Sequence, residues 1–273
     1  MRTPLAGWTP AHDARRIRAR DVALHRVRYG SEMCEPQDSV ELPTAPRRLT
    51  RFLLANVGVA TLALLLFAKV GEDVFEHESG SFDDGVRTWM LHHRTPGLFV
   101  LFTWITTAGS LGPMLVLTAT VVRWLWRTRR RRAAAGAIAA PALAVVLSNG
   151  IKLAFGRIRP DGAQYFALRS FAFPSGHATI STAVVATIAY VSWRERLLDG
   201  RLALAAAVVI PLLVGVSRMY LDVHWATDVI GGWSLGLLVA ALAATLYEWS
   251  RGDGGGGGAE PGAERRDRQI VKL

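Results

Sequence analysis

Two histidines in the second half of the sequence stand in settings that suit chemical work. His224 is followed four residues later by Asp228, so in a helix the two side chains share one face. A carboxylate in that position can fix the imidazole tautomer and leave the other ring nitrogen free to attack an electrophile. His177 has no such partner in sequence and is a candidate proton donor to a leaving oxygen. We therefore predict His224 as nucleophile, Asp228 as its orienting residue and His177 as general acid.

Residues that suit an anion accompany these histidines. Lys152 and Arg159 are seven residues apart, about two helical turns, and Arg218 adds a third cation. The forked guanidinium group of arginine matches the geometry of phosphate oxygens. Ser175 and Gly176 precede a long apolar run, so we expect them at a helix N-terminus, where free N–H groups and the helix dipole favour an anion. Together these residues predict a metal-free site for phosphoryl transfer.

The elements that position this site belong to a membrane protein. Of the 273 residues, 51% are hydrophobic, and they form blocks near membrane-spanning length. The six predicted spans cover residues 50–70, 98–125, 134–154, 176–193, 202–219 and 226–248. Val86, Trp89, Met90 and His93 share a face at helical spacing, which predicts an interfacial helix within residues 81–96. The predicted fold is all-α, a bundle of six transmembrane helices with an interfacial helix between spans one and two.

Polar tails flank the predicted six-span domain, residues 49–250. Residues 1–48 form a basic tail that we expect to be cytoplasmic and largely disordered, with a basic surface helix in residues 11–28 as the alternative. Residues 251–273 form a flexible, Gly-rich cytoplasmic tail. The first tail has no short apolar core with a small-residue cleavage site, so we expect the first span to act as the targeting signal.

Arginine carries most of the net charge of +10, with 29 Arg and 3 Lys residues. It gathers in both tails and in the loops after spans two and four, whereas the other loops hold few positive charges. The positive-inside rule then predicts a multi-pass plasma-membrane protein with both termini in the cytoplasm and the site near the outer face. Because the arginine runs flank apolar spans and no recognition module is visible, we do not expect a nucleic-acid partner.

Three segments carry a family resemblance. The stretches "KLAFGRIRP" (152–160), "PSGH" (174–177) and "SRMYLDVHWATD" (217–228) fit the patterns K-x6-R-P, PSGH and S-R-x5-H-x3-D. In this they resemble the type 2 phosphatidic acid phosphatase superfamily, which also includes vanadium haloperoxidases. The resemblance implies that His224 forms a phosphohistidine, Asp228 orients it and His177 protonates the leaving group. It also implies that Lys152, Arg159, Ser175, Gly176 and Arg218 bind the phosphoryl oxygens, with no metal or other cofactor.

The same resemblance implies a membrane lipid as substrate. Bacterial-type members act on polyprenyl diphosphates, phosphatidate and phosphatidylglycerol phosphate, and the Arg-rich, Lys-poor composition looks bacterial, which favours the polyprenyl diphosphate. One alternative is a lipid phosphotransferase, which shares the phosphohistidine step. Another is a non-catalytic transporter of phospholipids or polyprenyl phosphates that uses the cationic site for binding only. A haloperoxidase is disfavoured by the six-span layout, and the oligomeric state is left open.

Several charged residues and glycines lie outside these three patterns, and we expect them to have structural rather than catalytic roles. Arg157 fits no position of the three patterns, and we interpret it as an interfacial anchor. Asp222 is interpreted as a loop residue. Asp83 fits the N-terminal end of the interfacial helix, where the helix dipole favours negative charge. The spacing of Gly232 and Gly236 predicts close packing against a neighbouring helix.

Overall fold

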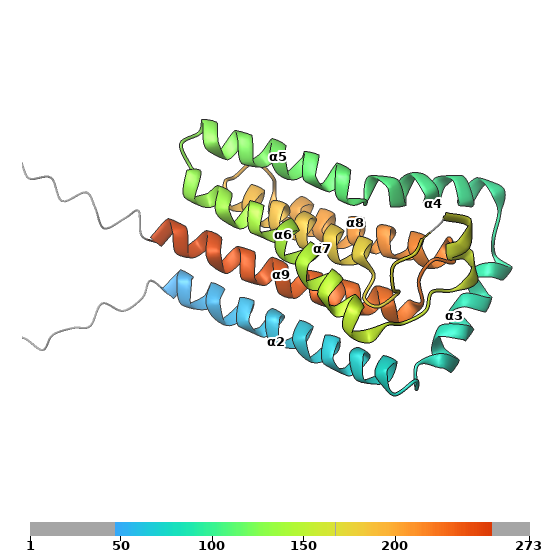
Figure 1. Cartoon of the computed structure of the whole chain (residues 1–273). Helices are drawn as coiled ribbons and strands as arrows, with labels where there is room; N and C mark the ends of the chain where they lie inside the picture. Colours follow the sequence, from blue (N-terminus) through green and yellow to red (C-terminus); the bar gives the residue numbers. More distant parts are fainter. Residues whose placement is uncertain (1–46, 167, 253–273) are drawn as a thin grey trace, which may run out of the picture. The chain divides into compact units, whose positions relative to one another are not determined.

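The computed structural model describes residues 47–166 and 168–252, and this part of the chain is helical, with no strand. The helices are α2 (Arg47–Phe75), α3 (Gly80–His92), α4 (Pro96–Ala108), α5 (Leu111–Arg127), α6 (Arg131–Phe155), α7 (Gly176–Arg194), α8 (Gly200–Tyr220) and α9 (Ala226–Gly252), with a 3-10 helix at Asp161–Phe166 (Figure 1). The all-α prediction is confirmed for these residues. The predictions for residues 1–46 and 253–273, including the alternative helix in residues 11–28, fall outside the described residues.

The described helices include α2, α6, α8 and α9 as four that are long and apolar enough to cross a membrane. α4 and α5 make a fifth span if they are counted together, and they meet at a bend of 47°. At this bend a Cβ added to Gly109 would come within 2.5 Å of Val214 Cγ2 on α8. The glycine therefore lets the interrupted span pack closely against α8.

α7 is the predicted span that does not meet this criterion of length and hydropathy. It lies between α5, α6, α8 and α9, and most of its residues are buried (Figure 1). Two of its hydroxyl groups bond to its own backbone: Thr179 Oγ1 donates to Ser175 O, and Thr182 Oγ1 donates to Ala178 O. Since other helices cover α7 and these two hydroxyls are satisfied, the helix does not need an apolar surface facing lipid, although Thr187 Oγ1 is buried with no partner among the described residues.

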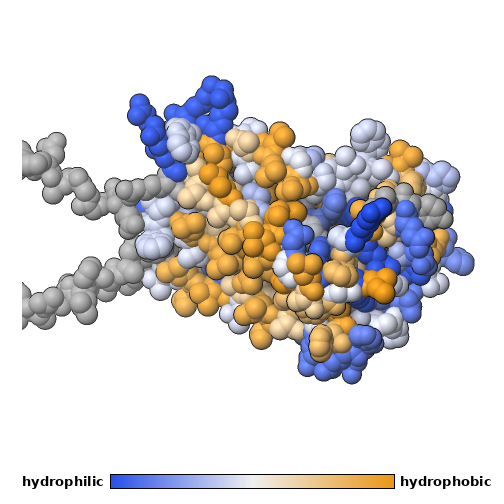
Figure 2. All heavy atoms as spheres, in the orientation of Figure 1, coloured by the Kyte–Doolittle hydropathy of each residue, from blue (hydrophilic) through white to orange (hydrophobic). Residues whose placement is uncertain are grey.

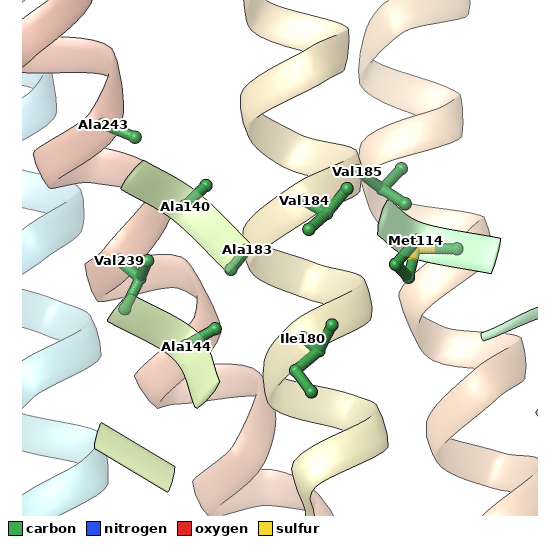
Figure 3. Close-up of a cluster of buried hydrophobic side chains, with 9 residues drawn as sticks. All are labelled: Met114, Ala140, Ala144, Ile180, Ala183, Val184, Val185, Val239 and Ala243. Atoms are coloured by element: carbon green, nitrogen blue, oxygen red, sulfur yellow. The ribbon is translucent and has the colours of Figure 1, made fainter. Parts of the chain in front are cut away.

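Small side chains bring the helices together in the core. One buried cluster consists of Met114, Ala140, Ala144, Ile180, Ala183, Val184, Val185, Val239 and Ala243, contributed by α5, α6, α7 and α9 (Figure 3). α9 approaches α7 closely at two glycines. A Cβ added to Gly232 would lie 2.8 Å from Ala178 Cβ, and one added to Gly236 would lie 2.5 Å from Thr182 Cβ. The predicted close packing at these glycines is confirmed, with α7 as the partner.

The outer surface of the bundle is apolar around its middle. On the face shown in Figure 2, hydrophobic residues form a band and hydrophilic residues gather at the two ends. Leu54, Leu62 and Leu65 of α2 are 69%, 70% and 62% exposed, although α2 is attached to α9 by the hydrogen bond from Asn56 Nδ2 to Ala241 O (2.9 Å). Exposed leucines on this scale belong in lipid, so the chain is a membrane protein.

The two ends of the bundle differ. The start of α2 and the end of α9 lie at one end (Figure 1). At the other end, α3 lies beside the connections from α6 to α7 and from α8 to α9, and it contacts both α8 and α9. α3 overlaps the segment 81–96 that is predicted to hold an interfacial helix; it begins one residue before this segment, at Gly80, and ends at His92. The predicted site residues gather at this second end.

Candidate active site

The three sequence patterns meet through their connections rather than through the middle of the helices. Arg159 Nη1 donates to Val223 O (2.8 Å), which joins the α6–α7 connection to the α8–α9 turn. Ser175 N donates to Asp228 O (2.9 Å), which joins the start of α7 to the start of α9. The structure thereby brings together at one end of the bundle the eight predicted site residues Lys152, Arg159, Ser175, Gly176, His177, Arg218, His224 and Asp228.

His224 and Asp228 form the pair that their spacing predicts. His224 Nδ1 lies 3.2 Å from Asp228 Oδ2, and both side chains are buried. The same carboxylate oxygen accepts a hydrogen bond from the backbone N–H of Trp225, the residue before α9 (2.9 Å). A carboxylate in the first turn that reaches back in this way caps the helix. The start of α9 therefore holds the carboxylate, and the carboxylate holds the imidazole.

The neighbours of His224 define its tautomer. Arg159 Nη1 lies 2.8 Å from His224 Nε2, and a guanidinium group can only donate hydrogen bonds. Nε2 must therefore accept, so the ring proton sits on Nδ1 and points to Asp228. Burial, together with the positive charges of Arg159, Arg218 and Lys152, holds the pKa of His224 well below its usual range. In this form the imidazole is neutral and carries an electron pair on Nε2 that faces Arg159, and a neutral imidazole nitrogen can act as a nucleophile.

Arg159 is fixed by the loop in front of α7. Its Nε donates to Ser170 O (2.7 Å), and its Nη2 donates to Ser170 Oγ (3.0 Å) and Phe171 O (3.3 Å). The guanidinium group thus spans the loop and the turn that carries His224. Any phosphorus atom bonded to His224 Nε2 would have its oxygens next to this group.

The start of α7 presents hydrogen-bond donors. Ser175 Oγ is buried, does not cap the helix and has no hydrogen-bond partner within the described chain. The N–H groups of the first turn have no intrahelical acceptors. A Cβ added to Gly176 would meet only Lys152 Cε, at 3.9 Å, so room remains beside the backbone. The His177 side chain is half-buried and makes no hydrogen bond to residues 47–166 or 168–252. These features suit an anion, as the sequence predicts.

Lys152 and Arg218 are buried near this turn, but their contacts differ. Lys152 Nζ donates to the carbonyls of Phe171 (2.8 Å), Ala172 (3.2 Å) and Pro174 (2.7 Å), so it holds the segment that leads into Ser175. Its predicted contact with phosphate stays a prediction. Arg218 Nη1 donates to Thr106 Oγ1 on α4 (2.8 Å), while its Nε is buried with no acceptor among the residues described.

The interpretation of Arg157 as an interfacial anchor is wrong. Its side chain is only 17% exposed and points into the protein, where Nη1 donates to Asp228 Oδ1 (2.7 Å) and Nη2 donates to Asp83 Oδ2 (2.6 Å). Two buried carboxylates attract the guanidinium group more strongly than the membrane surface does. Sequence reasoning missed this contact because 74 residues separate Asp83 from Arg157. The only available signal was that both are charged residues predicted near the outer ends of spans.

Known proteins resemble this chain in sequence and in fold. Residues 133–251 match the sequence model of the PAP2 superfamily. Phosphatidylglycerophosphatase B of Bacillus subtilis is 30% identical over 187 residues, which cover 67% of this chain and 92% of that protein. The putative undecaprenyl-diphosphatase YbjG of Escherichia coli is 33% identical over 137 residues, which cover 47% of this chain and 64% of that protein.

A solved structure adds to these likenesses. The crystal structure of a transmembrane PAP2 type phosphatidylglycerolphosphate phosphatase from Bacillus subtilis has a TM-score of 0.59 and 28% identity, and covers 73% of this chain and 95% of that chain. The predicted class of enzyme, a membrane-bound phosphatase, is confirmed. The chain belongs to the PAP2 superfamily.

Proposed function

We propose that this protein hydrolyses a lipid phosphate or diphosphate through a phosphohistidine on His224. The supporting observation is the placement of the imidazole, with Nδ1 at Asp228 and Nε2 beside Arg159. In the first step Nε2 attacks phosphorus, a P–N bond forms, the P–O bond to the lipid breaks, and His177 protonates the departing oxygen. In the second step His177 takes a proton from water, which attacks phosphorus and releases phosphate as the P–N bond breaks.

The cationic surroundings support the charge changes in this mechanism. In our proposal Arg159, Arg218, Ser175 and the N–H groups of the first turn of α7 hold the phosphoryl oxygens. Their electrostatic contribution grows during attack, because negative charge then builds on these oxygens. Gly176 leaves space for the phosphate, and Lys152 both adds positive charge and holds the loop before Ser175. The proposal includes no metal ion.

A cavity beside the turn that carries His224 and Trp225 supports a lipid substrate. It has a volume of about 600 Å³ and lies between the ends of α2 and α6 and the ring of Trp225. Its walls include Phe75 and Ile158, which are 73% and 83% exposed. Such a mixed opening suits a molecule with an apolar tail and a charged head. We propose that the lipid brings its phosphate to His224 from this side.

The substrate proposal is tested by comparing lipid and soluble esters. We expect kcat/KM for a long-chain polyprenyl diphosphate, phosphatidylglycerol phosphate and phosphatidate in detergent micelles to exceed that for a soluble phosphomonoester by at least about 100-fold, because binding of the apolar tail contributes only for lipids. Phosphate release is measured with EDTA present and with all amphiphiles at equal surface concentration. The ranking of the three lipids identifies the preferred head group.

The other outcomes point to other functions. Equal efficiency toward the soluble ester would contradict a lipid substrate. Appearance of the phosphoryl group on an added lipid acceptor, instead of free phosphate, would favour the phosphotransferase. No phosphate release with any ester would favour the transporter. Complete loss of activity in EDTA, restored by magnesium, would contradict the metal-free mechanism.

We further propose that both ends of the described domain face the cytoplasm and that the site faces outward. The start of α2 and the end of α9 lie at the same end of the bundle, which supports an even number of spans with α7 as one of them (Figure 1). Arginines gather in the connections at this end, after α5 and after α7. The site lies at the opposite end.

Cysteine labelling tests this orientation. Cys34 is the only cysteine, so a Cys34→Ser background permits single-site labelling. Gln164→Cys, at an exposed position in the α6–α7 connection, should react with an impermeant maleimide in intact cells. Leu197→Cys, at an exposed position between α7 and α8, should react only after permeabilisation. The reverse pattern would show that the orientation is inverted.

A further inference from the structure

The two oxygens of Asp228 are held from different sides. Oδ2 contacts His224 Nδ1 (3.2 Å) and the N–H of Trp225 (2.9 Å), and Oδ1 accepts from Arg157 Nη1 (2.7 Å). Asp228 has no exposed surface. A buried carboxylate needs a charged or hydrogen-bonding partner at each oxygen. Arg157 therefore supplies the contact that fixes the plane of the carboxylate facing His224.

Arg157 is itself held by α3. Its Nη2 donates to Asp83 Oδ2 (2.6 Å) and to Ser79 Oγ (3.1 Å), the residue before α3. Its guanidinium carbon lies 5.7 Å from the centre of the Trp225 ring. The planar group thus offers one nitrogen to Asp83 and the other to Asp228. A lysine carries a single nitrogen on a flexible stem and does not reproduce this two-sided contact.

Asp83 also binds the first turn of α9 directly. Its Oδ1 accepts from the backbone N–H of Thr227 (2.9 Å), and its Oδ2 accepts from Thr227 Oγ1 (2.7 Å). The N–H of Thr227 is one of the amides at the start of α9 that have no intrahelical acceptor, so Asp83 caps α9 from another helix. Thr227 is next to Asp228 in the chain. Asp83, which is 1% exposed, therefore fixes both the backbone and the arginine that hold Asp228.

A second ion pair joins α3 to the beginning of the loop that carries His224. Arg87 lies one helical turn after Asp83, and its Nε donates to Asp222 Oδ1 (2.8 Å). Asp222, in the loop where the sequence places it, also accepts from the N–H of Gly162 (3.1 Å). Arg87 and Arg157 each lie within 6 Å of the Trp225 ring centre, at 5.6 and 5.7 Å. α3 thus contacts both ends of the segment 222–228, which contains His224.

We propose that α3 positions the nucleophile, with Asp83 acting through Arg157 to hold Asp228, and thereby His224, in the reactive geometry. The inference rests on the proposed role of His224. A chain of hydrogen bonds runs from the Asp83 carboxylate to the Arg157 guanidinium group, and from there through the Asp228 carboxylate to the His224 imidazole. Asp83 and Arg157 are positioning residues in this proposal, since neither needs to touch the substrate.

The test replaces Asp83 with asparagine, which keeps the shape of the side chain and removes its charge. By analogy with hydrogen-bonded partners of metal-binding residues, we expect kcat to fall about 10- to 100-fold, with KM changed less than about threefold. The rate of phosphohistidine formation in a single turnover should fall by the same factor as kcat. Asp84→Asn, the same change at the neighbouring exposed residue of α3, is the matched control and should behave like the wild type.

A double-mutant cycle shows whether Asp83 acts through Asp228. If it does, kcat of the double variant Asp83→Asn, Asp228→Asn should be less than about twofold below kcat of the single variant Asp228→Asn. If the losses of kcat from Asp83→Asn and Asp228→Asn multiply in the double variant, the inference is overturned. It is also overturned if Asp83→Asn leaves kcat unchanged or only raises KM. A structural role alone would lower the thermal midpoint of the solubilised protein without slowing phosphohistidine formation in the folded fraction.

A second variant, Arg157→Lys, tests the same inference if Asp83→Asn does not fold. Arg157→Lys retains a positive charge next to Asp83 but loses the two-sided contact, so we expect the same loss of kcat. A wild-type kcat for Arg157→Lys would overturn the inference. If His224→Ala keeps its turnover, the proposed function fails instead. If His224→Ala is inactive while Arg157→Lys and Asp83→Asn are fully active, only the positioning role fails.

Discussion

Replacing His224 with alanine is expected to reduce phosphate release by at least about 10³-fold, since in the proposed mechanism the change removes the atom that bonds to phosphorus. The variant should remain folded. His224 lies in a turn outside the helix core, and the bonds from Arg157 and Trp225 to Asp228 persist without the imidazole. The measurement is phosphate release from a lipid substrate by purified, detergent-solubilised protein, with its thermal midpoint recorded alongside.

His92→Ala is the matched control for this variant. His92 lies on the exposed surface of α3 at the same end of the bundle, so its loss should leave turnover unchanged. After rapid quenching, the wild type and the control should carry an acid-labile phosphoryl group, and the His224→Ala protein should carry none. Near-normal turnover by the His224→Ala protein would show that another group is the nucleophile.

Asp228→Asn is expected to lower kcat by about 10²- to 10⁴-fold, in line with a carboxylate that sets the tautomer of a catalytic histidine. An asparagine can turn its NH2 group toward Nδ1 of His224. The ring proton would then move to Nε2, which would lose the electron pair that attacks phosphorus. The loss should be smaller than for His224→Ala, because the attacking atom is still present. Single-turnover formation of the phosphohistidine measures this directly.

Asp161→Asn makes the same chemical change at the same end of the protein and serves as control. The Asp161 side chain is 84% exposed and pairs with Arg87 at 3.1 Å, a contact expected to contribute little. Turnover should therefore match the wild type. An Asp228→Asn protein as active as this control would be inconsistent with the orienting role, and one as inactive as His224→Ala would assign Asp228 a larger part in the reaction.

Much of the fold follows from local sequence signals. Apolar blocks predicted where the long helices lie. The pairing of His224 with Asp228 was also predictable, because the two residues are one helical turn apart at the start of α9. Gly232 and Gly236 predicted close packing, although the sequence could not name α7 as the partner.

Contacts between distant segments could not be predicted in this way. Asp83 and Arg157 belong to a short helix and a loop, and no periodicity relates them. Lys152 shows the same limit, since its spacing from Arg159 does not reveal that its ammonium group meets three carbonyls of residues 171–174. These interactions depend on how the ends of the bundle fold over one another, which a single sequence does not encode in any local pattern.

The buried position of α7 bears on how the protein is made. During synthesis the helices reach the bilayer in chain order, so α7 arrives before α8 and α9, which later cover it. A helix with this many hydroxyl groups gains less from lipid contact than its apolar neighbours do. Its place in the bundle therefore depends more on contacts with α6, α8 and α9 than on contacts with lipid. The start of α7 meets Asp228 only after α9 has been made, so a half-made chain lacks the complete set of proposed site residues and would not act on the lipids around it.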